Sequence, residues 1–154
     1  MFSMSSLNHY IDGWMTHRKA LHELIDAFDS KNLQYKPWDE GMSVSELVLH
    51  ISTSTNMFAQ TVKNGVFAPP ATPKTPETIS ELKQLVETDT AETKSALEAI
   101  TDEQLNQLVE FAGMKMTGTA MLEMAKDHEI HHKGQLFTYA RLLGIEKLPF
   151  FVSR

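Results

Sequence analysis

Large side chains recur at alternating steps of four and three residues over the first thirty positions of the chain. The series comprises Tyr10, Trp14, His17, Leu21, Leu24 and Phe28. An α-helix turns once in about 3.6 residues, so this spacing places all of these side chains along one seam, as in helical bundles. A helix with such a seam needs other elements to cover it, and the rest of the chain supplies further helix patterns.

Four segments have the apolar periodicity of α-helices. We expect them at about residues 5–29, 44–63, 76–100 and 118–143. Ser43 and Glu46 have the spacing of a capping box before the second segment. Thr75 and Pro76 suit the N-cap and the first helical position of the third. The pattern predicts an all-α protein, a four-helix bundle that forms a single domain over residues 1–154.

The connections between these segments differ in character. The segment from Asn64 to Pro76 is rich in proline, which lacks a backbone N–H and cannot lie inside a helix. We therefore expect a crossover loop of about a dozen residues, which is long for a compact domain but typical of some bundles. Between the third and fourth helices, Leu108 to Met116 includes Gly113 and favours a small β-hairpin.

Composition excludes several kinds of function. The chain contains no cysteine, so a disulfide scaffold and a thiolate metal site are both ruled out. The formal net charge is -6 and the basic residues are scattered, which argues against nucleic-acid binding. No apolar run approaches the length needed to span a membrane. Met1 to Trp14 does not resemble a signal peptide, and we expect a cytoplasmic protein that acts on a small-molecule substrate.

Two histidines in the last predicted helix are the strongest indication of chemistry. His128 and His132 are four residues apart, which places them on one face of a helix. We expect this face to be the centre of the buried stripe, with Glu129 and Lys133 directed away from the core. His50 lies on the inward side of the second helix and is the best candidate for a third ligand. Neutral imidazoles bind Zn, Ni, Cu and Fe.

Other interpretations of these residues stay open. His128 and His132 can instead be satisfied by hydrogen bonds to a carboxylate and a backbone carbonyl, without a metal. His17 is a rival ligand, since it lies on the seam of the first helix, although packing explains that position equally well. Gln135 and Tyr139 lie on the same face as the histidine pair and are candidates for orienting a ligand or a substrate.

Two stretches resemble the DinB/YfiT-like superfamily of small metal-binding proteins. The first is His128-Glu-Ile-His-His-Lys-Gly-Gln135 in the last helix, and the second is Ser43-Val-Ser-Glu-Leu-Val-Leu-His50. The resemblance covers essentially the whole chain. It implies an up-down-down-up four-helix bundle, one divalent transition metal on His50, His128 and His132, and a homodimer. Activities in the superfamily include transfer of low-molecular-weight thiols such as bacillithiol, mycothiol-dependent isomerisation and a hydrolase activity.

Three protein ligands leave a coordination position open, which is the pattern of a catalytic rather than a structural site. An external thiol or water can take that position. We expect a Zn- or Ni-dependent transferase that acts with a low-molecular-weight thiol on small electrophiles. The alternatives are a metal-dependent hydrolase and a non-catalytic, stress-related metal-binding bundle.

The sequence also bears on assembly. Ile130 and Phe137 are expected on the outer side of the last helix, where two large apolar residues suggest a homodimer contact. The C-terminal run Leu148-Pro-Phe-Phe151 is the other candidate to cover them.

Overall fold

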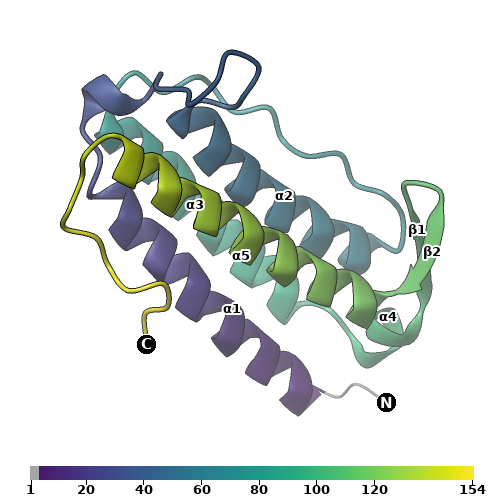
Figure 1. The fold of residues 1–154 in the computed structure, drawn as a ribbon. Helices are drawn as coiled ribbons and strands as arrows, with labels where there is room; N and C mark the ends of the chain where they lie inside the picture. Colours follow the sequence, from purple (N-terminus) through teal and green to yellow (C-terminus); the bar gives the residue numbers. More distant parts are fainter. Residues whose placement is uncertain (1–3) are drawn as a thin grey trace.

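The computed structural model describes residues 4–154, in which four long helices lie side by side (Figure 1). They are α1 Met4–Ile25, α2 Val44–Asn64, α3 Ile79–Glu98 and α5 Gly118–Leu142. The short elements are the 3-10 helix η1 Ser30–Asn32, the helix α4 Asp102–Asn106, and the strands β1 Leu108–Phe111 and β2 Met114–Thr117. Residues 1–3, which begin the segment inspected for a signal peptide, lie outside the described residues.

The helices are arranged up-down-down-up. α1 and α5 run in one direction, while α2 and α3 run in the other, and the crossover that joins α2 to α3 returns along the outside of the bundle (Figure 1). α2 packs against both α5 and α3, and α1 packs against α3 and α5. The expectation of an all-α four-helix bundle with a long crossover is confirmed.

The third helix begins later than the sequence pattern predicted. Its N-cap is Thr78, whose hydroxyl accepts a hydrogen bond from the backbone N–H of Glu81 at 3.1 Å. The predicted cap, Thr75, and the predicted first residue, Pro76, belong instead to the crossover, where Pro76 is buried. The prediction failed because two threonines three residues apart are both good caps, and only Thr78 is followed at the third helical position by a carboxylate. That carboxylate, on Glu81, accepts the backbone N–H of Glu77 at 2.8 Å.

The first helix also ends earlier than predicted. α1 stops at Ile25 instead of Asp29, and Phe28 is buried from the turn that follows. The sequence pattern extended the helix to Phe28 because this side chain, although it follows the helix, packs in the same core cluster as Leu21 and Leu24.

Polar side chains divide the core of the bundle into two apolar clusters. One cluster contains Trp14, Phe58 and Met121 near the hairpin end, and the other contains Leu21, Leu47 and Leu136 towards the opposite end. Between Trp14 and Leu21 on α1 lies Arg18, which is fully buried. Buried hydroxyl groups on α2 and α3 lie near the same level of the bundle, so the middle of the core is polar.

The predicted hairpin is present. β1 and β2 pair antiparallel, with Phe111 opposite Met114. The two turn residues, Ala112 and Gly113, have φ angles of 51° and 79°, as a two-residue hairpin turn of the left-handed type requires. The hairpin places Phe111 against Phe58 of α2, with ring centroids 5.2 Å apart.

None of the described helices is long and apolar enough to cross a membrane.

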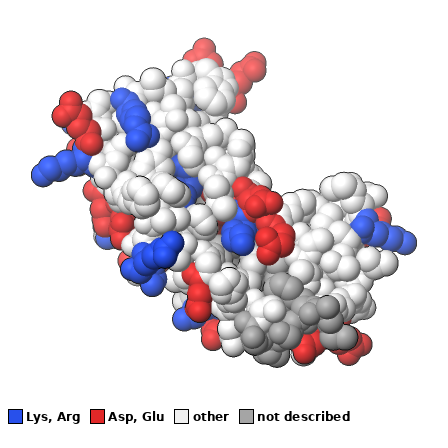
Figure 2. All heavy atoms as spheres, turned by 60° about the horizontal axis from the view of Figure 1, so that its bottom comes forward, with Lys and Arg blue, Asp and Glu red and all other residues white. Residues whose placement is uncertain are grey.

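On the face drawn in Figure 2, acidic and basic side chains are interspersed, and neither sign forms a continuous patch.

Two glycines of α5 should respond in opposite ways to alanine. A Cβ at Gly118 would lie 2.5 Å from the carbonyl oxygen of Gln104 and 2.8 Å from Cγ1 of Val62, whereas a Cβ at Gly134 meets nothing within 4 Å. We expect Gly118→Ala to destabilise the fold by about 1–3 kcal/mol, since overpacking forces backbone shifts. Gly134→Ala should stabilise it by roughly 0.5–1 kcal/mol, because alanine is the better helix former. Urea unfolding followed by circular dichroism measures both, and equal effects of the two changes would contradict the close packing of α5 on α4.

Candidate metal centre

The structure brings His50, His128 and His132 together on adjoining faces of α2 and α5. One ring nitrogen from each lies within 4.8 Å of those of the other two. Nε2 of His50 and Nε2 of His128 are 3.1 Å apart. All three side chains are half-buried, so the cluster is reached from the surface of the bundle.

The contacts of the Nδ1 atoms show how the three imidazole rings are oriented. Nδ1 of His132 lies 2.7 Å from Oε1 of Gln135. A carboxamide oxygen only accepts hydrogen bonds, so His132 carries its proton on Nδ1 and directs the lone pair of Nε2 elsewhere. Nδ1 of His50 is 3.5 Å from the hydroxyl of Ser54. Nδ1 of His128 is buried and has no hydrogen-bond partner among the described residues.

Burial and neighbouring charges favour the neutral form of His128 and His50. Burial, followed by the positive charges that His132, His50 and His131 would carry, lowers the pKa of His128 to about 4. Burial, followed by the neighbouring His132, also lowers the pKa of His50. Neutral imidazole is the form that binds metal ions. The residues present therefore fit a borderline divalent metal that prefers nitrogen ligands, such as Zn²⁺ or Ni²⁺.

The histidine pair does not lie at the centre of the buried stripe of α5, as the sequence predicted, but at its edge. The buried residues of this helix are Gly118, Met121, Leu122, Ala125, Glu129, Lys133, Leu136, Phe137, Tyr139 and Ala140. The expectation that Glu129 and Lys133 are directed away from the core was wrong, because both carry charges that are paired or hydrogen-bonded inside it. The stripe is thus rotated towards these two residues, and the histidines gain access to solvent.

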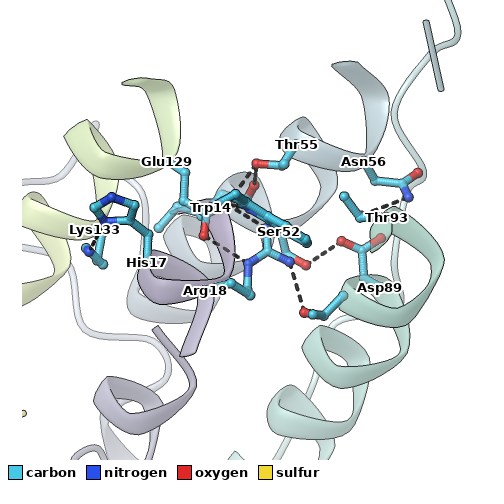
Figure 3. A network of polar contacts seen from close by, with 12 residues as sticks. Trp14, His17, Arg18, Ser52, Thr55, Asn56, Asp89, Thr93, Glu129 and Lys133 are labelled. Atoms are coloured by element: carbon cyan, nitrogen blue, oxygen red, sulfur yellow. Dashed lines mark hydrogen bonds and ion pairs between the residues drawn. The ribbon is translucent and has the colours of Figure 1, made fainter. Parts of the chain in front are cut away.

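Glu129 is held by side chains from two other helices (Figure 3). Its carboxylate accepts hydrogen bonds from Nε and Nη2 of Arg18 at 2.9 and 2.7 Å, and from the Trp14 indole at 3.0 Å. The Thr55 hydroxyl on α2 donates at 2.9 Å. Burial alone would raise the pKa of Glu129, but Arg18 and these hydrogen bonds hold it below its usual range. Arg18 also donates to the Thr90 hydroxyl on α3 at 3.0 Å, so the network joins all four long helices.

Comparison with known proteins identifies the family of this chain. Residues 4–154 match the DinB family. The chain belongs to the DinB family. It is 40% identical over 154 residues to the uncharacterized protein YjoA of Bacillus subtilis (strain 168), covering 98% of this chain and 99% of that one.

Two crystal structures of DinB-like proteins are similar to this fold. That of YjoA from Bacillus subtilis has a TM-score of 0.82 at 38% identity and covers 95% of this chain and 99% of its own. That of a DinB-like protein from Bacillus cereus ATCC 10987 has a TM-score of 0.78 at 17% identity and covers 92% of this chain and 94% of its own. At that identity the second comparison supports the fold alone.

His17, the rival ligand, lies apart from the cluster in this DinB-family chain. Its Nδ1 lies 2.8 Å from Nζ of Lys133, on the side where α1 faces α5 (Figure 3). Lys133 also donates to the carbonyl oxygen of Phe151 in the C-terminal segment. Burial lowers the pKa of this lysine to about 8. His17 therefore takes part in packing the C-terminal segment and α1 against α5.

Gln135 and Tyr139 have separate roles. Gln135 contacts His132 directly and fixes the orientation of its ring. The Tyr139 hydroxyl instead donates to the carbonyl oxygen of Met42 at 2.9 Å, and its ring meets Tyr35 and Trp38 edge-on. Tyr139 thus holds the segment before α2 in place.

The structure adds Ser54 and Phe58 to the surroundings of the cluster. Both lie on the face of α2 that carries His50, at four and eight residues beyond it. Phe58 stacks edge-on near His128, with ring centroids 6.2 Å apart. The periodicity of α2 indicated that both face inward, but it did not indicate which of the inward residues adjoin the histidines.

The proposed surface pair on α5 is not a pair. Phe137 is 7% exposed and belongs to the core, whereas Ile130 is 38% exposed. Leu148 packs against the same core cluster, which favours the interpretation that the C-terminal segment covers Phe137. The expectation that Phe137 lies on the outer surface was therefore wrong, and the homodimer stays a prediction.

Removal of Glu129 should strongly destabilise the fold. Glu129→Ala leaves the guanidinium of Arg18 buried without its partner, which typically costs about 3–5 kcal/mol. The control Asp127→Ala, on an exposed position two residues earlier, should change the free energy of unfolding by less than about 0.5 kcal/mol. The double change Arg18→Met and Glu129→Leu should recover much of the loss. Urea denaturation followed by circular dichroism measures all three, and similar values for Glu129→Ala and Asp127→Ala would show that the pair does not anchor α5.

Proposed function

We propose that His50, His128 and His132 bind one divalent transition metal, Zn²⁺ or Ni²⁺, and that the protein is a metal-dependent transferase. It would act with a low-molecular-weight thiol on small electrophiles. The observation that carries the metal assignment is the convergence of the three ring nitrogens within 4.8 Å, with the opposite nitrogen of His132 fixed by Gln135. The nitrogen donors, the neutral rings and the orienting amide are the features expected of a site for such a metal.

A metal held by three imidazoles supplies a Lewis acid that lowers the pKa of a thiol or of water bound to it. The protein's own residues then determine what can approach. A cavity of about 310 Å³ adjoins His50 and is also lined by Met42, Leu49 and Thr53. This volume suits a small molecule. On the other side, the rings of Phe58 and Phe111 form an apolar wall next to His128.

The two candidate reactions differ in what they require of the carboxylates near the cluster. A metal-dependent hydrolase commonly uses a carboxylate beside the metal as a general base. Glu129, next to His128 in the sequence, is fully buried against Arg18 and is not available for this role. Asp127 is exposed, but Glu46, one turn before His50, lines the cavity beside that histidine and is positioned to act as such a base. A thiol whose pKa is lowered by the metal needs no base, so the proposed transferase does not require Glu46, whereas a hydrolase would.

The homodimer, the cytoplasmic location and the single domain stay predictions from the sequence and the family resemblance. Ile130 and Leu142 of α5 and Phe150 of the C-terminal segment are exposed apolar residues that a dimer contact could bury.

Loss of one histidine should remove the metal. We expect His128→Ala to weaken metal binding by more than about 100-fold, since even changes to residues behind the ligands cost roughly 10–100-fold. His17→Ala is the matched control and should keep a full equivalent, because His17 contacts Lys133 and not the cluster. Elemental analysis of purified protein and competition with a chelator dye measure both. Full metal content in His128→Ala would contradict the assignment.

Conversion of an electrophile should require added thiol. With cobalt as the bound metal, a small thiol should shift the visible absorption spectrum of the wild-type protein and leave that of the His128→Ala protein unchanged. Turnover of 1-chloro-2,4-dinitrobenzene should then depend on both metal and thiol. Turnover of ester substrates without thiol would favour the hydrolase, and a spectrum that does not respond to thiols would favour a closed, non-catalytic site.

A further inference from the structure

The crossover between α2 and α3 covers a second cavity, apart from the three histidines. Its volume is about 450 Å³, within the range of small-molecule sites. Leu49 of α2, Leu85 of α3 and Pro73 of the crossover form apolar walls. The crossover returns along the outside of the bundle next to α2 (Figure 1). Residues of α2 and α3 therefore line the inner side of the cavity, and residues of the crossover line its outer side. None of the metal-binding candidates lines it.

One side of this cavity carries a carboxylate that forms no ion pair with a lysine or arginine among the described residues. The Ser52 hydroxyl donates to Oδ2 of Asp89 at 2.5 Å, between α2 and α3 (Figure 3). Both residues line the cavity. The nearby Arg18 donates its hydrogen bonds to Glu129 and Thr90 instead.

The charge of the lining has one dominant sign. Glu81 and Glu92 line the cavity together with Asp89, and Lys74 is the one basic residue among the lining residues. Burial raises the pKa of Asp89, although the hydrogen bond from Ser52 and the positive charge of Arg18 oppose this. A half-buried carboxylate in an apolar cavity is stabilised most by a ligand that brings a positive charge and N–H donors.

We propose that this cavity binds a small amphipathic primary amine. The ammonium group donates to Asp89, and the apolar body lies against Leu49, Leu85 and Pro73. A neutral ligand of the same shape would leave the carboxylate without a charged partner, and an anionic one would be repelled by it. The cavity adjoins the one beside His50, and the two share the lining residues Leu49, Thr53, Pro73, Thr75 and Pro76. Binding nevertheless requires none of the three histidines, so this site does not rest on the proposed transferase activity.

Calorimetric titration of the full chain with 2-phenylethylamine tests the proposal. We expect saturable binding of one equivalent, with the same affinity in protein prepared with and without metal. The isosteric alcohol 2-phenylethanol should bind at least about tenfold more weakly, because it lacks the charge. The anion 3-phenylpropionate should not bind. Equal affinities for the amine and the alcohol, or binding of the amine that His128→Ala abolishes, would overturn the proposal.

Variants locate the site. Asp89→Asn keeps the shape and should weaken amine binding at least about tenfold. Glu87→Gln removes the same charge from the same helix at a position outside the lining and should leave it unchanged. Thr88→Trp, at an exposed position of the lining, should block the cavity without disturbing the core. Wild-type affinity in folded Asp89→Asn contradicts the proposal, and if that variant does not fold, wild-type affinity in Thr88→Trp does so.

Discussion

The ion pair between Arg18 and Glu129 is the contact on which the rest of the bundle depends. Both side chains are fully buried, so each charge has lost its hydration. The attraction of the partner charge offsets that cost, and removing either residue leaves a buried charge without compensation. The carboxylate has four donors on two helices, and the guanidinium reaches a third helix through Thr90. Apolar contacts alone tolerate sliding and rotation of helices. This network permits one rotation of α5 about its axis and one register against α1.

The orientation of the candidate metal centre follows from that rotation. His128 and Glu129 are adjacent in the sequence, so they project about 100° apart around the helix. When Glu129 enters the core, His128 is turned towards the edge of α5 that faces α2, where it meets His50. His132 follows one turn later on the same edge, and Gln135 sets its ring. The ion pair between Arg18 and Glu129, on a different side of α5, therefore sets the direction of the histidines before any metal binds.

Much of this was predictable from the sequence, and the failures have a common cause. Periodicity located four helices and a proline-rich crossover, and the four-residue spacing of His128 and His132 indicated a shared face. Glu129 and Lys133 were misjudged, and Arg18 was not singled out, because charged residues are rarely buried unless paired. Arg18 and Glu129 are 111 positions apart in the sequence, and His17 and Lys133 are 116 apart, so no local pattern marks these pairs. Placing Glu129 in the core from the start would have moved the histidines to their observed edge.

The separation of roles on α5 also bears on how such proteins diverge. One edge of the helix carries the histidines and faces solvent, whereas another carries the anchor and faces the core. Substitutions that alter reactivity on the first edge leave the contacts of the second unchanged. Selection for new chemistry and selection for folding thus act on different residues of the same helix. A helix built in this way should tolerate changes on its histidine edge without loss of the fold.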